Sequence, residues 1–394
     1  MNTPVITSMC RTPMGRMLGA FSNNFSAAQL GAVVIKEAVK RSQIQPEEVD
    51  HVLMGQVISA GCAQNTARQA TIYAGLPVSV GAITINKVCG SGMATVMWAA
   101  QMIKSGDMDV LVAGGTENMS MAPYLLMKGR QGYRFGNDQV IDSMYYDGLY
   151  DIYNDMAMGN TGDIISDRFN ISREEMDEFA FRSHQRAHQA TEAGKFKEEI
   201  IPVEIPVRKK GSITITKDEG IRPDTTLEKL AKLPPVFKPK DGKVTAGNAS
   251  QISDGASAVV VMSEDLAKEM GIPILAKIGP YGTNATKPEW VMEAPVTGVE
   301  QLLERTGFTI NDFDLIEHNE AFASASCAVR NSLNIPDEKF NVNGGAVALG
   351  HPLGCSGTRI LVTLYHELKK RKGRRGLATI CLGGGEALTM IIER

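Results

Sequence analysis

Short apolar segments alternate with segments of helical periodicity along the first third of the chain. The apolar segments predict strands at residues 4–8, 49–54, 80–88 and 109–113. Residues 26–42 and 93–104 carry apolar side chains at helical spacing, with Ser26 as the expected N-cap of the first helix. Apolar strands separated by helices are typical of a mostly parallel sheet covered on both faces, so we expect an α/β fold.

The pattern changes between residues 119 and 248. This segment holds a Met/Tyr/Gly-rich stretch, a polar helix expected over residues 172–192, and a basic run between residues 208 and 243. Apolar periodicity returns at residues 256–262. We interpret the segment as an insertion, largely helical and irregular, over the first half. The expected boundaries are 1–118, 119–248 as the inserted domain, 249–270 as a return to the first half, and 271–394.

The last part of the chain repeats the first. Residues 39–56 align without a gap to residues 303–320, so that Asp50 matches Asp314. Further on, and in the same order, Ser91-Gly92 matches Ser356-Gly357, and the Gly-Gly-Thr-Glu of 114–117 matches the Gly-Gly-Gly-Glu of 383–386. Convergence on common helix and strand sequences is the alternative, but three ordered matches favour two copies of one α/β unit. Ligands bind beyond the carboxyl ends of strands in such sheets, so equivalent loops of both halves should meet at one crevice.

Composition narrows the class of protein. The chain of 394 residues has 43% hydrophobic and 22% charged residues and a net charge of −3, so no global field attracts nucleic acid or an anionic membrane. The first fifteen residues lack the pattern of a signal peptide, and no apolar run is long enough for a membrane span. We expect a soluble, cytoplasmic protein.

Metal and disulfide chemistry are not expected. The six cysteines contain no Cys-x-x-Cys pair, and in a large cytosolic chain they should be reduced. His184 and His188 are one helical turn apart, which is a possible metal-ligand spacing, but no third ligand stands nearby. We interpret them as part of a solvated helix face.

Cys89 is the first candidate for chemistry, in the segment NKVCGSGM. It follows a predicted strand and precedes a Gly-Ser-Gly turn into a predicted helix. The helix start would favour a thiolate at this position, and the glycines would let a ligand approach. The alternative is a buried, inert cysteine.

Further candidates come from the matching loops of the second half. His351 lies in a glycine-rich loop and could act as a base for a cysteine nucleophile or donate to an oxyanion. Cys381 ends a predicted strand and could move a proton. The N–H groups of Gly383 and Cys89 are a natural oxyanion hole, and Asn319 could fix a water, although a structural turn is an alternative for Asn319.

These residues carry a resemblance to the thiolase family. The motifs are collinear over essentially the entire chain: PVITSMCRTPMG, NKVCGSGM, GGTENMS, TAGNASQISDGA, NEAFA, NGGAVALGHPLGCSG and CLGGG. The resemblance implies a five-layer αβαβα fold of two related halves with an inserted loop domain, forming a homodimer or homotetramer. It implies coenzyme A (CoA) thioesters as substrates and no cofactor.

The resemblance also implies roles for the candidate residues. Cys89 would attack an acyl-CoA and become acylated, with His351 as its base. Cys381 would then remove a proton from a second acetyl-CoA, whose enolate His351 and an Asn319-held water would stabilise. The pantetheine and adenine of CoA would run along Met158, Arg222, Ala246 and Ser250, with Phe322 lining the pocket.

Basic residues in the insertion offer a second possible contact to CoA phosphates, although such runs are usually solvated. They are Arg208, Lys209, Lys210, Lys229 and Lys232.

Three positions depart from the family's usual pattern. Ala157 replaces a His, the usual Thr-Ala-Glu-Asn reads as residues 161–164 (Thr-Gly-Asp-Ile), and Glu386-Ala387 replaces Met-Gly. A carboxylate at 386 could raise the pKa of Cys381 by repulsion. These departures leave the residues of the acylation step in place, but they could change which substrates fit and how fast the condensation step runs.

The first hypothesis is condensation of two acetyl-CoA to acetoacetyl-CoA, or the reverse thiolysis. The nearest alternative is a longer-chain 3-ketoacyl-CoA thiolase of fatty-acid breakdown. A hypothesis from another class is an inactive thiolase-like protein that binds acyl-CoA or lipid.

Overall fold

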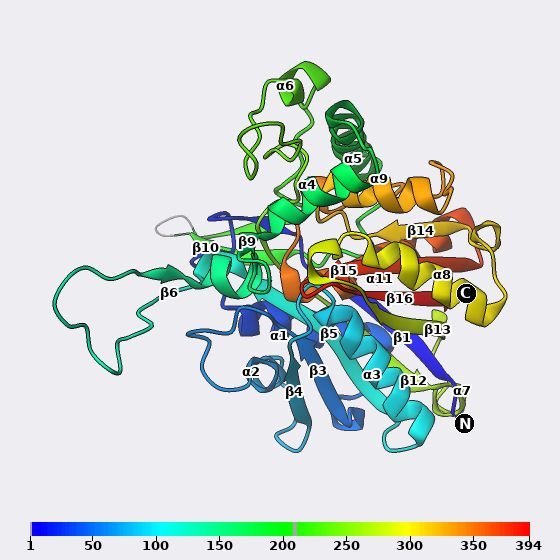
Figure 1. Ribbon diagram of the computed structural model, residues 1–394. Helices are drawn as coiled ribbons and strands as arrows, with labels where there is room; N and C mark the ends of the chain where they lie inside the picture. Colours follow the sequence, from blue (N-terminus) through cyan, green and yellow to red (C-terminus); the bar gives the residue numbers. More distant parts are fainter. Residues whose placement is uncertain (1, 208–210) are drawn as a thin grey trace.

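A mixed sheet runs through the protein in the computed structural model, which describes residues 2–207 and 211–394 (Figure 1). The strands are β1 (Pro4–Arg11), β2 (Gly15–Arg16), β3 (His51–Gly55), β4 (Gly81–Ile85), β5 (Val110–Asn118), β6 (Tyr124–Leu125), β7 (Ile141–Asp142), β8 (Tyr150–Asp151), β9 (Met156–Ala157), β10 (Val203–Val207), β11 (Gly211–Ile215), β12 (Ser253–Ser263), β13 (Ala276–Ala285), β14 (Leu315–His318), β15 (Arg375–Leu382) and β16 (Glu386–Glu393). The helices are α1 (Ala27–Ser42), α2 (Thr66–Tyr73), α3 (Ser91–Ser105), α4 (Met158–Arg168), α5 (Arg173–Glu192), α6 (Leu227–Ala231), α7 (Glu264–Glu269), α8 (Ala294–Thr306), α9 (Ala323–Ser332), α10 (Ala346–Leu349) and α11 (Leu353–Arg371).

The strand order confirms the duplication. The first half runs β4-β3-β5-β12-β1 and the second runs β14-β15-β16-β13. In both, one parallel pair (β3 with β5, β14 with β15) is followed by two antiparallel pairs. Within the described residues, the two half-sheets pair edge to edge through β1 and β13, at Val5 with Lys277 and Ile6 with Ala276.

The expectation of a mostly parallel sheet is wrong. Among the named strands in the described part of the chain, the parallel pairs are β3 with β4, β3 with β5, and β14 with β15. The second half shows the reason, because β15 turns directly into β16 through residues 383–385, and a hairpin makes its strands antiparallel. Helical crossovers alone would have made the strands parallel.

Asp50 and Asp314, matched in the sequence repeat, make equivalent bonds. Oδ2 of Asp50 accepts from the N–H groups of Asp109 and Val110, each at 2.9 Å. Oδ2 of Asp314 accepts from those of Arg374 and Arg375, at 2.7 and 2.9 Å. Each carboxylate therefore ties the start of one strand to the start of its parallel neighbour.

The chain forms five layers. Helices α3 and α11 lie between the two half-sheets, where apolar side chains of both sheets and both helices form one core. A second core lies under α1 and α2 on the outer face of the first half-sheet, and a third under α8 and α9 on that of the second. The central helices touch through glycines: a Cβ on Gly92 would lie 2.7 Å from Oγ1 of Thr358, and one on Gly357 would lie 2.4 Å from N of Met93.

Local signals placed several helix ends. Ser26 caps α1 in a reciprocal capping box with Gln29, and Ser172 caps α5 through the N–H of Glu175. Other ends differ from expectation, since α3 begins at Ser91 instead of residue 93 and β5 continues to Asn118 instead of ending at residue 113. Both extensions pass through glycine-rich stretches that tertiary contacts hold in regular structure.

The insertion supplies helices α4 to α6 and several short hairpins, and it covers one end of the two halves (Figure 1). Of the basic run, residues 208–210 lie outside the described residues, while Lys229 pairs with Asp224 at 2.7 Å on an exposed surface. In the described residues, no helix is both long enough and apolar enough to cross a bilayer.

The interpretation of His184 as a solvated residue is wrong. His184 is 3% exposed, and its Nδ1 accepts from the N–H of Arg222 at 3.1 Å. The reason is that this face of α5, with Ala180 and Ala187, packs inside the insertion. Burial lowers the pKa of His184 to about 4, so the ring is neutral there.

Candidate active site

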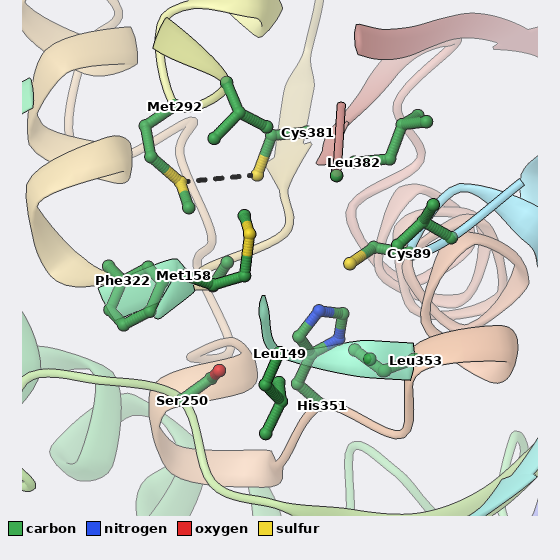
Figure 2. Close-up of a pocket in the computed structure, with 15 residues that line it drawn as sticks. Cys89, Leu149, Met158, Ser250, Met292, Phe322, His351, Leu353, Cys381 and Leu382 are labelled. Carbon is green, nitrogen blue, oxygen red and sulfur yellow. Dashed lines mark hydrogen bonds between the residues drawn. The ribbon is translucent and has the colours of Figure 1, made fainter. Parts of the chain in front are cut away.

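Cys89 lies in a tight turn between β4 and α3. Val88 adopts a left-handed φ of 46°, which is rare for a β-branched residue. The hydroxyl of Ser91 holds the turn, since it accepts from the N–H of Lys87 at 2.8 Å and donates to the carbonyl of Val88 at 2.6 Å. The turn directs the Cys89 sulfur into a cavity (Figure 2).

The structure brings Cys89, His351, Cys381 and Gly383 together around that cavity, whose volume is about 50 Å³. In Figure 2 both sulfurs and the imidazole face the same space. The remaining lining is mostly apolar: Val88, Gly148, Leu149, Met158, Ser250, Val291, Met292, Ala321, Phe322, Leu353 and Leu382. The crevice expected from the duplicated halves is therefore present.

Hydrogen bonds orient the His351 ring. Nδ1 of His351 lies 2.6 Å from Oγ of Ser356, and that hydroxyl donates to the carbonyl of Pro352 at 2.9 Å. The hydroxyl of Ser356 has one proton, and where that proton goes to Pro352, Oγ accepts from Nδ1–H of the imidazole. This arrangement is the one in which Nε2 of His351 carries no proton and can act as a base.

Asn319 is fully buried behind His351 and does not line the cavity. Its Nδ2 lies 3.4 Å from Nε2 and 3.5 Å from Nδ1 of the imidazole. Its Oδ1 has no hydrogen-bond partner among the residues that the structure describes. A buried carbonyl oxygen of this kind is suited to bind a water.

The expectation that the helix start would favour a Cys89 thiolate is not met in this structure. Burial raises the pKa of Cys89 to about 12, and it outweighs the lowering by the N–H groups of Gly383 and of Cys89 itself. Burial also lowers the pKa of His351 to about 3, with a smaller contribution from the charge of Arg359. At neutral pH the two groups are therefore a thiol and a neutral imidazole.

Cys381 and Glu386 also differ from expectation. Burial first, and then the nearby Cys89, raise the pKa of Cys381, and Glu386 is not among the causes. Glu386 instead pairs with Lys87, on the loop that carries Cys89. The sulfur of Cys381 lies 3.8 Å from that of Met292.

A second cavity of about 270 Å³ adjoins the first. Both are lined by Leu149, Met158, Ser250, Phe322, His351 and Leu353. The second continues past Ala157 and Phe237. Three of the residues predicted to bind CoA (Met158, Ser250 and Phe322) therefore line a path that leads to Cys89.

Arg222 and Ala246 do not line these cavities. Both are exposed, and Arg222 lines a separate cavity of about 170 Å³ with His184, Lys229 and Gly247. No cluster of three or more His, Cys, Asp or Glu side chains suited to a metal ion occurs within the described ranges.

Sequence reasoning missed several lining residues, notably Leu149, Met292 and Leu353. Met292 lies in an ordinary apolar stretch before α8, and nothing in its local pattern separates it from a core residue. Leu353 follows the predicted His351-Pro352, so proximity to the histidine was the only available signal.

Comparisons with known proteins agree with the two-part fold. The family models described as "Thiolase, N-terminal domain" and "Thiolase, C-terminal domain" match residues 4–265 and 272–394. The fold thus has its counterpart in a known class of enzymes. The chain belongs to the thiolase family.

Individual relatives match over the full length. The chain is 50% identical over 393 residues to an acetyl-CoA acetyltransferase of Syntrophomonas wolfei subsp. wolfei, covering 99% of this chain and 98% of that protein. It is 48% identical to one of Cupriavidus necator, covering 100% of both. The crystal structure of the Bacillus anthracis acetyl-CoA acetyltransferase matches with a TM-score of 0.97 at 43% identity, over 100% of this chain and 99% of that one.

Proposed function

We propose that this protein is an acetyl-CoA C-acetyltransferase, which condenses two acetyl-CoA to acetoacetyl-CoA and free CoA and also catalyses the reverse thiolysis. The observation that carries the proposal is the single small cavity lined by Cys89, His351 and Cys381. The names of the full-length relatives give the acyl group. CoA thioesters are the substrates, and no cofactor is needed.

The first half-reaction acylates Cys89. Nε2 of His351 accepts the thiol proton as the sulfur attacks the thioester carbonyl, forming the new carbon–sulfur bond. We assign the stabilisation of the oxyanion to the N–H groups of Cys89 and Gly383, and the support is that both lower the pKa of the Cys89 thiol and so lie close to the attacking sulfur. The bond to CoA then breaks, and His351 returns the proton to the leaving thiolate.

The second half-reaction forms the carbon–carbon bond. Cys381 first gives its thiol proton to Nε2 of His351, which is free again after the first half-reaction, and the thiolate then takes a proton from the methyl of a second acetyl-CoA. The His351 imidazolium and an Asn319-held water stabilise the enolate. The carbanion attacks acetyl-Cys89, and the sulfur of Cys89 leaves as acetoacetyl-CoA forms. The proton held by His351 passes to the Cys89 sulfur, so that both cysteines are thiols again and the imidazole is neutral.

The size of the inner cavity supports a short acyl group. About 50 Å³ is available beside the two sulfurs, enclosed by Met158, Val291 and Met292. A water needs about 10–15 Å³ on this scale, so the space fits a few heavy atoms and no long alkyl chain. A longer-chain 3-ketoacyl-CoA thiolase is therefore not favoured, and an inactive binding protein would not need both thiols beside an unprotonated imidazole.

The test is a pair of substitutions. Cys89→Ser should abolish the mass increase of one acetyl group after incubation with acetyl-CoA, while Cys381→Ala should keep that acylation and lose the cleavage of acetoacetyl-CoA by CoA. Intact-protein mass spectrometry and the magnesium-enolate absorbance are the readouts. Unchanged turnover in Cys89→Ser, or a wild-type protein that cleaves no acetoacetyl-CoA, would refute the proposal.

We also propose a cytoplasmic homo-oligomer, a dimer or a tetramer. Support comes from exposed apolar side chains around the edge strand β4, with Val78 80% and Ile83 44% exposed. A loop between β6 and β7 extends away from the body and carries Phe135 at its surface (Figure 1). All six cysteines are free thiols, which suits a reducing compartment. Light scattering after size-exclusion chromatography would give the subunit number, and a monomer at micromolar concentration would contradict the oligomer.

A further inference from the structure

Two fully buried carboxylates hold the loop of His351 from either side. The first belongs to Glu117, near the end of β5 in the first half. Its Oε2 accepts from the N–H groups of Val57 at 3.0 Å and Gly354 at 2.9 Å, and its Oε1 accepts from that of Ile58 at 3.1 Å. Gly354 is the second residue of α11, and it follows His351 by three positions.

Glu117 acts as a cap for α11. The residue that precedes this helix is Pro352, which makes no side-chain cap bond. A carboxylate from the other half of the chain satisfies one of the free N–H groups and interacts favourably with the helix dipole. The first turn of α11 also carries Ser356, which orients the imidazole of His351. The carboxylate thus acts on the ring through the start of the helix.

The second carboxylate belongs to Glu320, which directly follows Asn319. Its Oε2 accepts from Oγ of Ser183 at 2.7 Å and from the N–H of Val347 at 3.1 Å, and its Oε1 accepts from Nδ2 of Asn341 at 2.9 Å. Val347 precedes His351 by four positions, in α10. Ser183 connects Glu320 to the same loop a second time, because its Oγ also accepts from the N–H of Gly345 at 3.1 Å.

Both carboxylates accept only from neutral groups. Every hydrogen bond described above comes from a backbone N–H, a hydroxyl or an amide, and burial raises the pKa of Glu117 to about 7 and that of Glu320 above its usual range. The charge of the buried Arg359 partly offsets this pKa shift at Glu320, while Glu117 has no such cation among the causes of its shift. Burying a carboxylate without a direct ion pair destabilises the fold. A glutamine at position 117 would avoid that cost, but its amide would turn a donor toward one of three N–H donors.

We propose that Glu117 and Glu320 are positioning residues that clamp the His351 loop at Val347 and Gly354, and so hold the imidazole in the cavity that it shares with the Cys89 sulfur. The inference rests on the proposed function for its kinetic consequence. The clamp joins both halves of the chain and the insertion, since its donors come from the loop after β3, from α5, from α10 and from α11. It fixes a reactive group that the short cavity loops alone would leave free to move.

The experiment replaces each carboxylate with its amide, as Glu117→Gln and Glu320→Gln, singly and together. The first readout is the rate of Cys89 alkylation by iodoacetamide between pH 6 and 9, followed by intact mass. The second is kcat and KM for the thiolysis of acetoacetyl-CoA. A displaced imidazole should lower both the alkylation rate at pH 8 and kcat by about 10- to 100-fold, because small misplacements of a reactive group cost this much.

The Michaelis constant should respond differently. Met158, Ser250 and Phe322 line the proposed CoA path, and none of them supplies a hydrogen bond to either carboxylate, so KM should change by less than about threefold. The double variant should lose less than the product of the single losses, because both residues hold one loop. Ser183→Ala removes a single donor to Glu320 and gives a milder form of the same test if an amide variant does not fold.

Asp50→Asn and Asp314→Asn are the matched controls. Each carboxylate also accepts two backbone N–H groups, but at the opposite ends of β3 and β14. These variants should lose thermal stability and keep the alkylation rate and kcat. Wild-type rates in folded Glu117→Gln and Glu320→Gln would overturn the proposal, as would an equal loss in the two controls.

The alkylation assay contains no CoA substrate, so it separates this inference from the proposed function. A wild-type protein that cleaves no acetoacetyl-CoA but shows the alkylation contrast would refute the function and support the clamp. A protein that cleaves acetoacetyl-CoA, but whose amide variants are alkylated as fast as the wild type, would support the function and refute the clamp.

Discussion

Gly115 and Gly354 meet where the two halves of the chain touch: a Cβ on Gly115 would lie 1.9 Å from the carbonyl oxygen of Gly354. Gly115 is in β5 and Gly354 is in the first turn of α11. Space is equally short on the side of Gly354, since a Cβ on Gly354 would lie 2.6 Å from the carbonyl oxygen of Thr116, the residue after Gly115. Backbone opposes backbone at this crossing, so neither side can yield by turning a side chain.

Gly115→Ala should therefore lower the free energy of unfolding by about 3 kcal/mol, at the upper end for overpacking. Chemical denaturation would measure it. Gly282→Ala is the control, because a Cβ on this strand glycine would lie 3.6 Å from Nη2 of Arg305, an ordinary contact. Equal stability of the two variants would show that the halves can separate at this point.

Ser356→Ala should lower kcat for thiolysis by at least about tenfold, because the imidazole of His351 would lose the acceptor that sets its tautomer. KM should change little. Ser257→Ala is a suitable control, since its hydroxyl donates to the carbonyl of Cys355 in the same helical turn at 3.0 Å but does not contact His351. If Ser257→Ala lost as much activity, the fall in kcat of Ser356→Ala would come from disturbed helix packing and not from the imidazole of His351.

Met292→Ala should widen the cavity beside Cys381 and admit a longer acyl chain. The ratio of kcat/KM for 3-ketohexanoyl-CoA to that for acetoacetyl-CoA should rise by about tenfold or more, since each added methylene in a fitted pocket is worth about 10- to 200-fold. A ratio also cancels any loss of catalysis common to both substrates. Met292→Leu conserves volume and should leave it near the wild-type value. An unchanged ratio in Met292→Ala would place the limit on chain length elsewhere.

His366 should make stability depend on pH. It is 6% exposed, and burial lowers the pKa of its imidazole to about 3 in the folded chain. Between the usual value of about 6.5 and about 3 the unfolded chain binds the extra proton, so this contribution is present above pH 6.5 and is lost as pH falls. Linkage gives a loss of up to about 2 kcal/mol between pH 7 and pH 5.

His366→Leu should remove that part of the pH dependence. Urea unfolding of both proteins at pH 7 and pH 5 would show the variant losing less stability on acidification. An equal loss in both proteins would mean that the imidazole is already protonated, or solvated, in the folded state.

Sequence patterns were sufficient for much of the fold. The gapless match of residues 39–56 with 303–320 predicted the duplication, and Asp50 and Asp314 turn out to make the same strand-start bonds. Ser26 and Ser172 marked true helix starts, because capping depends on residues only a few positions apart. The thiolase motifs indicated the five-layer architecture, which the family match confirms.

Other features depended on contacts between distant segments. The antiparallel directions of β12 and β16 follow from their connections, which the expectation of a mostly parallel sheet did not contain. The burial of His184 depends on the segment near Arg222, and the pairing of Glu386 with Lys87 depends on how two loops of different halves meet. Helix periodicity and family pattern contain none of this information.

By itself, the sequence determined which residues carry reactive groups and that two copies of one α/β unit hold them. Its motifs placed Cys89, His351 and Cys381 on loops because local turn chemistry and strand ends are encoded in neighbouring residues. Only the tertiary structure decided the protonation of these groups, the volume beside them and the carboxylates that fix their loop. Burial and distance set those quantities, and both arise from side chains hundreds of positions apart that come together only in the folded chain.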